Sequence, residues 1–214
     1  MRDESPDPGR RRLLRAALAL AGAASVSGLA GCAQDVRPAL SAQDSDDVAR
    51  VEAYLNRLGA FEARFEQVWP DGGESTGTAF FLAPDRLRLV YDPPTRMVMV
   101  AAAGKLVLHN YANESVTRVG LSGNPLGLLL RKPVTLSGAI TVTSVQRAPG
   151  VVALSLARTD NPAQGLLTLT FADSPLLLTG IEMVDAAGHD TRLRFSSQRR
   201  PDALDPSLFD TATA

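Results

Sequence analysis

The chain has 214 residues, 45% of them hydrophobic, and a formal net charge of −1 at pH 7. This length supports one hydrophobic core, and a near-neutral charge provides no field that would attract nucleic acid. A single cysteine excludes an internal disulfide, and two histidines leave few side chains for a zinc site or for histidine-based catalysis.

Residues 1–31 have the layout of a secretory signal peptide, with arginines followed by an uncharged run rich in Ala and Leu. The stretch "GRRRLLR" resembles a twin-arginine export signal, although Arg-rich starts also serve the general export route. A permanent membrane span is the alternative. It is disfavoured because the run is shorter than the about 20 apolar residues that a span needs and contains Gly and Ser.

The signal-like run ends in "LAGC", residues 29–32, which resembles the bacterial lipobox. Small residues before a cleavage site fit a narrow peptidase groove, and a cysteine thiolate accepts a thioether-linked diacylglycerol. We therefore expect cleavage before Cys32 and acylation of Cys32. Residues 32–44 are polar and are expected to form a tether to a domain over residues 45–214.

The first predicted element of this domain is an amphipathic helix. Ser45 followed by two acidic residues is typical of a helix N-cap, and Gly59 ends the pattern. The apolar face of this helix carries Val48, Val51, Leu55 and Leu58.

The pattern then changes to a period of two, which indicates half-buried strands separated by turn residues. Strands are expected over residues 61–69, 76–83, 85–91, 97–102, 106–111, 116–121, 139–147, 151–159, 165–172, 176–185 and 190–198. Between the sixth and seventh strands, "NPLGLLLRKP" predicts a short buried helix. The sequence therefore predicts a mainly antiparallel sheet of about 11 strands curled around helices.

Catalytic motifs are missing from the sequence: no serine has the Gly-x-Ser-x-Gly frame, and no glycine-rich phosphate loop is present. Glu62 and Glu66 flank Arg64 on a charged strand face, which is more simply a solvated surface than a pair of catalytic acids. We therefore predict that the protein is not an enzyme.

Apolar side chains are more abundant than a thin sandwich needs, which suggests a cavity lining. An ordinary core is the alternative for any one of them. The candidates for a lipid-binding cavity are Phe61, Phe65, Trp69, Phe80, Leu82, Met97, Met99, Leu126, Leu129 and Leu130.

From about Val48 to Phe209, the chain resembles the LolA family of periplasmic carriers for outer-membrane lipoproteins. The resemblance rests on the order and spacing of "YLNRLGAFEARFEQ", "FFLAPDRLRLVYDPP", "VAAAGKLVLHNYANESVTR", "SGNPLGLLL" and "DPSLF". It implies an unclosed antiparallel β-barrel whose concave face is covered by helices that enclose the acyl chains of a lipoprotein.

The resemblance also implies partners. The cargo is an acylated lipoprotein, taken from an ABC-type extractor in the inner membrane and passed to a receptor in the outer membrane. The expected protein is monomeric, periplasmic, and without cofactor, metal or nucleic acid.

Two features depart from the family pattern. The family often has an arginine that holds the lid closed at the position of Ala83, so either the lid is held closed in a different way or Arg86 or Arg88 substitutes. The carriers are also normally soluble, whereas this chain has a lipobox, as does the outer-membrane receptor LolB of the same fold. The alternatives are therefore a carrier, a receptor anchored to the outer membrane through Cys32, or a periplasmic lipid sensor. Ala33 after the cysteine favours sorting to the outer membrane.

Overall fold

The computed structural model describes residues 40–122, 126–127 and 130–211 of the chain. The predicted signal peptide and Cys32 lie outside the described residues. Of the described helices, α1 is neither long enough nor apolar enough to cross a membrane.

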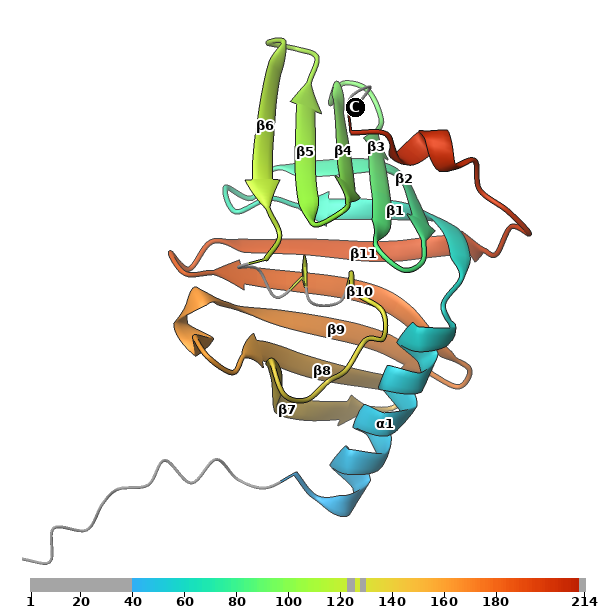
Figure 1. Ribbon diagram of the computed structural model, residues 1–214, viewed down its shortest axis with the longest axis vertical. Coiled ribbons are helices and arrows are strands. Elements are labelled where there is room, and N and C mark those ends of the chain that lie inside the picture. The colour runs from blue at the N-terminus through green and yellow to red at the C-terminus, as the bar shows by residue number, and fades with distance from the viewer. Residues whose placement is uncertain (1–39, 123–125, 128–129, 212–214) are drawn as a thin grey trace, which may run out of the picture. The chain divides into compact units, whose positions relative to one another are not determined.

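Eleven antiparallel strands form one sheet, which is unclosed because β6 and β7 are its two edges (Figure 1). The order across the sheet is β6-β5-β4-β3-β2-β1-β11-β10-β9-β8-β7, so the first and last strands of the meander meet in the middle. The strands are β1 (Ala60–Val68), β2 (Glu74–Leu82), β3 (Arg86–Tyr91), β4 (Met97–Ala102), β5 (Lys105–Asn110), β6 (Ser115–Gly120), β7 (Ile140–Ala148), β8 (Val151–Arg158), β9 (Gly165–Asp173), β10 (Leu176–Asp185) and β11 (Asp190–Arg199). The predicted fold class is confirmed.

Helix α1 (Ala42–Arg57) precedes the sheet and begins earlier than the sequence predicted. Its N-cap is Ser41, not Ser45: the Ser41 hydroxyl accepts from the Asp44 backbone N–H, and the Asp44 carboxylate accepts from the Ser41 N–H, both at 3.1 Å. This reciprocal capping box uses the spacing Ser-x-x-Asp, a variant of the usual Ser-x-x-Glu, and therefore starts the helix inside the predicted tether.

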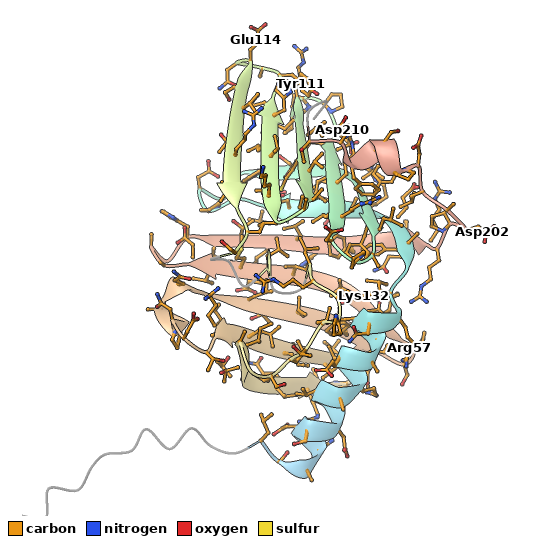
Figure 2. The ribbon with its side chains drawn as sticks, viewed as in Figure 1. Arg57, Tyr111, Glu114, Lys132, Asp202 and Asp210 are labelled. Atoms are coloured by element: carbon orange, nitrogen blue, oxygen red, sulfur yellow. The ribbon has the colours of Figure 1, made fainter. Side chains whose placement is uncertain are left out.

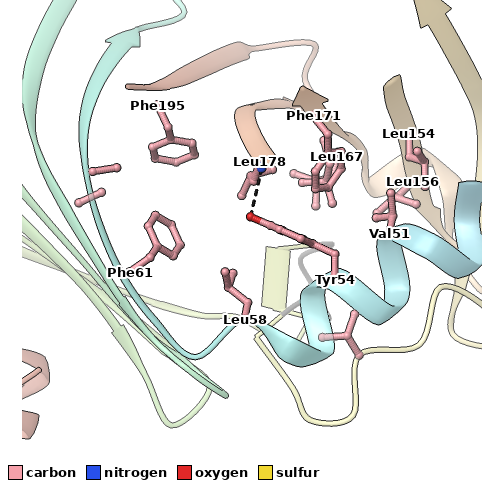
Figure 3. Packing of buried hydrophobic residues seen from close by; sticks show 14 of the residues in the cluster. Val51, Tyr54, Leu58, Phe61, Leu154, Leu156, Leu167, Phe171, Leu178 and Phe195 are labelled. Carbon is pink, nitrogen blue, oxygen red and sulfur yellow. Dashed lines mark hydrogen bonds between the residues drawn. The ribbon is translucent and has the colours of Figure 1, made fainter. Parts of the chain in front are cut away.

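The two faces of the sheet have different partners. The inner face, defined as the face that contacts α1, carries a cluster of 20 buried apolar residues, to which α1 contributes Val51 and Tyr54, together with its C-cap residue Leu58 (Figure 3). The outer face carries a smaller cluster over β2 to β5, which is closed by the C-terminal segment with the short 3₁₀ helix η2 (Pro206–Phe209). A second 3₁₀ helix, η1 (Pro162–Gln164), connects β8 and β9.

The segment over residues 124–133, predicted to form a short helix, is described only in part. Leu126 and Gly127 are helical, and the Leu130 N–H donates to the Leu126 carbonyl at 3.2 Å, as in one turn of a helix. Leu126 and Leu130 pack with Leu121 and Ala101 in a third apolar cluster.

Gly77 allows two aromatic side chains to approach across the centre of the inner face. It is paired with Phe65 on one side and with Tyr91 on the other. These two rings meet edge to face with centroids 5.1 Å apart. A Cβ atom at Gly77 would lie 2.2 Å from the Val90 carbonyl oxygen and 2.6 Å from the Phe65 ring. Only glycine therefore fits between the two rings.

We predict that Gly77→Ala lowers the free energy of unfolding by about 3 kcal/mol, because both the Val90 backbone and the Phe65 ring must move. Gly120→Ala on edge strand β6 is the control, since a Cβ there meets nothing within 4 Å; we expect its effect to stay within about 0.5 kcal/mol. Urea unfolding of the three proteins measures the difference. Equal midpoints for the two variants would contradict the account of Gly77.

Candidate active surface beneath the helix

The candidate site is the apolar interior between the inner face and α1. Tyr54 on α1 meets Phe171 on β9 edge to face with ring centroids 5.6 Å apart. Phe61 lies 5.5 Å from Phe81 and 6.2 Å from Phe195, measured between ring centroids. The alternation of β1 places its aromatic side chains on this face. Figure 3 shows the labelled side chains from α1, β1 and the strands β8 to β11 converging on one another.

Tyr54 also fixes α1 to the sheet through a hydrogen bond. Its hydroxyl accepts from the Leu178 backbone N–H at 3.1 Å, where the pairing of β10 with β9 shifts register between Leu178 and Gly180. The Leu178 N–H, which lies at this irregularity in the strand pairing, thus has a side-chain hydroxyl as its hydrogen-bond partner. The Arg200 guanidinium lies 6.0 Å from the centre of the same ring.

Ion pairs fasten the N-terminal half of α1. Arg147 on β7 contacts Asp44 at 2.8 Å and Asp47 at 2.7 Å, and Arg50 contacts Asp173 at 2.5 Å. The Ser41 hydrogen bonds and the Arg147 guanidinium hold the pKa of Asp44 below its usual range. Exposed pairs of this kind stabilise by less than about 1 kcal/mol each, so they orient the helix more than they bind it.

A second segment, residues 130–136, packs beside α1 and completes what we call the cover. Asn56 accepts from the Val134 N–H at 2.9 Å and donates to the Val134 carbonyl at 2.8 Å. Glu52 accepts from the Leu136 N–H at 2.7 Å. Val134 and Leu136 are themselves buried in the inner cluster. Because α1 holds this segment by three hydrogen bonds, the two parts of the cover are expected to move together.

Of the two alternatives for the family's locking arginine, the structure does not support substitution by Arg86 or Arg88. Both lie on the outer face of β3, and Arg88 donates to the Leu208 carbonyl at 2.8 Å. The amide of Asn56 instead joins α1 to the covering segment.

The cover is closed in this structure. The hollow between the end of α1 and the covering segment measures about 20 Å³, which is room for about one water molecule. Its lining includes Leu55, Val134 and Ala83. Figure 2 shows Arg57 and Lys132, two exposed cations, beside this end of α1. An acyl chain at this junction therefore requires the cover to separate from the sheet.

A polar group interrupts the apolar surface at the far end of β1. Gln67 is 2% exposed, and its Oε1 accepts from the Tyr91 hydroxyl at 2.7 Å. Burial raises the pKa of the Tyr91 hydroxyl above its usual range. Nearby, the Trp69 indole donates to the Ser75 hydroxyl at 3.0 Å. Gln67 was not among the predicted site residues, although a glutamine in the apolar register of "FEARFEQVW" was a visible signal.

The structure brings together five of the predicted cavity residues. They are Phe61, Phe65, Trp69, Met97 and Met99, all in or against the inner cluster. Leu126 and Leu130 lie in the adjacent third cluster, and Leu129 lies outside the described residues.

Phe80 and Leu82 do not belong to this group, and their assignment to the same cavity is corrected. Both pack on the outer face against Val98, Val100 and the C-terminal Phe209. In "AFFLA", adjacent apolar residues leave the direction of each side chain undecided. Strand geometry sends Phe81 inward and its two neighbours outward.

Among the described residues, no group of three or more His, Cys, Asp or Glu side chains is placed to hold a metal ion. Glu62 pairs with Arg199 at 2.6 Å, and Arg64 pairs with Asp92. The charged face of β1 therefore consists of ion pairs in solvent.

An unclosed antiparallel sheet with an apolar inner face under a helix is the architecture that the sequence predicted for a LolA-like protein. The family described as "Outer membrane lipoprotein carrier protein LolA" matches residues 56–212. The chain belongs to this family.

The chain is also similar to individual named proteins. The outer-membrane lipoprotein carrier protein of Methylococcus capsulatus is 27% identical over 169 residues, covering 75% of this chain and 81% of the relative. That of Pseudomonas syringae pv. syringae is 27% identical over 176 residues, covering 78% and 84%. The crystal structure of a LolA superfamily protein from Nitrosomonas europaea covers 82% of this chain and all of that chain, with 15% identity and a TM-score of 0.41.

We predict that Asn56→Ala loosens the cover, because it leaves the N–H and the carbonyl of the buried Val134 without their partner. The free energy of unfolding should fall by about 2 kcal/mol, and the fluorescence of a dye that binds exposed apolar surface should rise. Asn161→Ala is the matched control, since Asn161 is exposed and its side chain makes no cap hydrogen bond. If both variants match the wild type in unfolding and in dye binding, Asn56 does not hold the cover.

Proposed function

We propose that the protein binds the acyl chains of lipoproteins between the cover and the inner face, and that it takes part in their localisation to the outer membrane. The observation that carries this proposal is the inner face itself. It is an extended, mainly apolar surface, with Phe65, Leu167 and Phe171 almost fully buried, under a cover attached by a few directional hydrogen bonds. Family membership supplies lipoproteins as the cargo.

The energetics favour exchange between cover and ligand. Each buried CH₂ group contributes about 0.8 kcal/mol, so an acyl chain cannot cross an aqueous compartment unshielded. When the cover opens, Val51, Leu58 and Val134 lose their contacts with the sheet. A bound acyl chain then buries the apolar surface of the sheet that these residues leave. Opening and loading are therefore coupled, and the closed state returns after release.

The binding residues in this proposal are Phe61, Phe65, Trp69, Met97 and Met99. The two methionines are half-buried at the edge of the inner cluster, and their flexible thioethers suit a surface that adapts to different chains. Leu126 and Leu130 are proposed to border the same space, and Leu129 remains a candidate from the sequence.

The proposed partners follow from this role. The protein receives acylated lipoproteins from an ABC-type extractor in the inner membrane and delivers them to a receptor in the outer membrane. We propose a monomeric periplasmic binding protein that performs no chemical reaction and needs no cofactor, metal or nucleic acid.

A second candidate is a receptor anchored in the outer membrane, and it is favoured by the lipobox-like "LAGC" that ends in Cys32. A receptor would use the same interior but would remain attached to the membrane through the acylated cysteine. The two roles differ in whether function requires Cys32.

We predict that depletion of the protein in its native cell makes outer-membrane lipoproteins accumulate in the inner-membrane fraction, because their acyl chains lose the route across the periplasm. Membrane fractionation and immunoblotting of an endogenous lipoprotein measure the shift. An unchanged distribution after full depletion would contradict a role in lipoprotein localisation.

Complementation by Cys32→Ser then separates the two candidates, with intact-mass measurement of the mature N-terminus as the check on acylation. A soluble carrier restores the distribution without the cysteine. An anchored receptor does not restore it, although the variant is folded and exported.

A further inference from the structure

The two edges of the sheet, β6 and β7, differ in how they are protected from pairing with another strand (Figure 1). The pairing of β7 with β8 shifts register between Val142 and Ser144, and the end of β7 is held against α1 by the ion pairs of Arg147. Irregularities and covering elements of this kind protect a sheet edge. In contrast, β6 pairs with β5 in continuous register, contains no proline, and is exposed along all six residues.

The backbone of β6 has a row of hydrogen-bonding groups that point away from the sheet. Directly after β6, the Leu121 N–H donates to the Gly104 carbonyl at 2.9 Å. In an antiparallel pair, residues that bond to the neighbouring strand alternate with residues that do not. The N–H and C=O groups of Val116, Arg118 and Gly120 therefore point outward. Among residues 40–122, 126–127 and 130–211, no hydrogen bond to another element pairs these groups.

The side chains of β6 also suit the addition of a strand. Val116, Thr117 and Val119 are β-branched and favour extended backbone. Val116 is 38% exposed and Val119 is 46% exposed, and their spacing places them on opposite faces of the sheet. A strand added beside β6 would therefore gain apolar cross-strand contacts on both faces, in addition to main-chain hydrogen bonds.

The end of β6 lies beside the proposed acyl-binding space. Val119 is paired with Leu106 on β5, and Leu106 packs against the third apolar cluster with Leu126 and Leu130. A strand antiparallel to β6 would begin opposite Gly120, at this end, and run about 20 Å toward the tip of the β5–β6 hairpin. Because lipobox cleavage makes the acylated cysteine the first residue of a mature lipoprotein, the polypeptide that leaves the acyl chains has the direction that this edge requires.

We propose that β6 binds, as an added antiparallel strand, the polypeptide segment that directly follows the acylated cysteine of the cargo. This inference rests on the proposed function, because the cargo is the lipoprotein whose acyl chains occupy the interior. Pairing with a sheet edge recognises main-chain N–H and C=O groups, which every polypeptide has. The edge therefore holds cargo proteins of different sequence in the same way, and the acyl chains and the first residues of the cargo bind together.

The test uses three synthetic lipopeptides, each a dipalmitoylglyceryl-cysteine followed by the same tail of six serine and alanine residues. One has an unmodified backbone, and the other two carry N-methyl groups on alternate tail residues, in complementary sets. In an added strand, the N–H groups of one set face β6 and those of the other face solvent. Displacement of a fluorescent fatty acid gives the affinities. We expect one methylated set to weaken binding about tenfold, which is the effect of one to two net hydrogen bonds, and the other to weaken it less than about twofold.

Two variants at one position locate the contact. Arg118→Pro removes an outward N–H of β6 and keeps the bonds to β5, since the Arg118 N–H does not face that strand. We expect this variant to bind the unmodified lipopeptide about tenfold more weakly and to lose the difference between the two methylated sets. Arg118→Ala is the matched control, because it removes the guanidinium and keeps the N–H, and it should bind like the wild type. All three proteins should bind the fluorescent fatty acid equally, and thermal unfolding checks that each is folded.

The outcomes separate the two proposals. If the wild type binds all three lipopeptides equally, the contact with β6 is overturned while the carrier function stands. If it binds neither the fatty acid nor any lipopeptide, the proposed function fails and the inference fails with it. If Arg118→Pro keeps the difference between the methylated sets, the cargo segment pairs elsewhere. If the wild type sediments as a dimer that Arg118→Pro converts to monomers, a second copy of this chain occupies the edge, and pairing with cargo is overturned.

Discussion

The contact between the apolar inner face and its cover is the constraint on which the rest of the structure depends. A sheet of eleven strands exposes one apolar face that must be buried, and in the described residues one α-helix and one irregular segment bury it. A closed barrel or a second sheet would seal such a face permanently. Here the sealing elements are small and attached at one side, so their contact with the sheet is the part of the fold best suited to open and close.

The polar contacts of the cover have two different roles. The ion pairs of Arg147 with Asp44 and Asp47 lie at the surface, where they contribute little to stability. The bonds from Asn56 to Val134 and from Tyr54 to Leu178 involve buried backbone groups, and losing either partner would leave those groups unsatisfied. The buried bonds therefore determine the closed geometry, and the apolar contacts supply most of the attraction. If a ligand replaces the apolar contacts between the cover and the sheet, its binding has to offset only the free energy lost with a few hydrogen bonds.

Alternation in the sequence was sufficient to predict the strands to within two residues, because a half-buried strand must repeat every two residues. It failed where neighbouring residues are both apolar, as at Phe80 and Phe81, since the pattern then does not show which side chain points inward. The start of α1 was misplaced because the Ser41–Asp44 capping box was overlooked in favour of Ser45.

Local sequence patterns could not predict the polar parts of the site. Asn56 and Val134 are 78 residues apart, and Gln67 and Tyr91 are 24 apart. The strand register that brings Tyr91 beside Phe65 passes through Gly77, whose importance follows only from the distances to its neighbours. Phe61, Phe65 and Trp69 on the inner face were predictable, whereas the hydrogen bonds that hold the cover and interrupt the apolar surface required the three-dimensional arrangement.

The central claim is that acyl chains displace the cover from the inner face. Amide hydrogen exchange of Val134, Leu136 and Leu178, measured with and without a triacylated lipopeptide, tests it most directly, because these three N–H groups bond to α1. The account predicts that the ligand accelerates exchange at these three amides and leaves the strand amides of Leu154 on β8 and Leu169 on β9 protected. Binding of the lipopeptide with unchanged or slower exchange at all three amides would show that the cover stays in place, and would contradict the account.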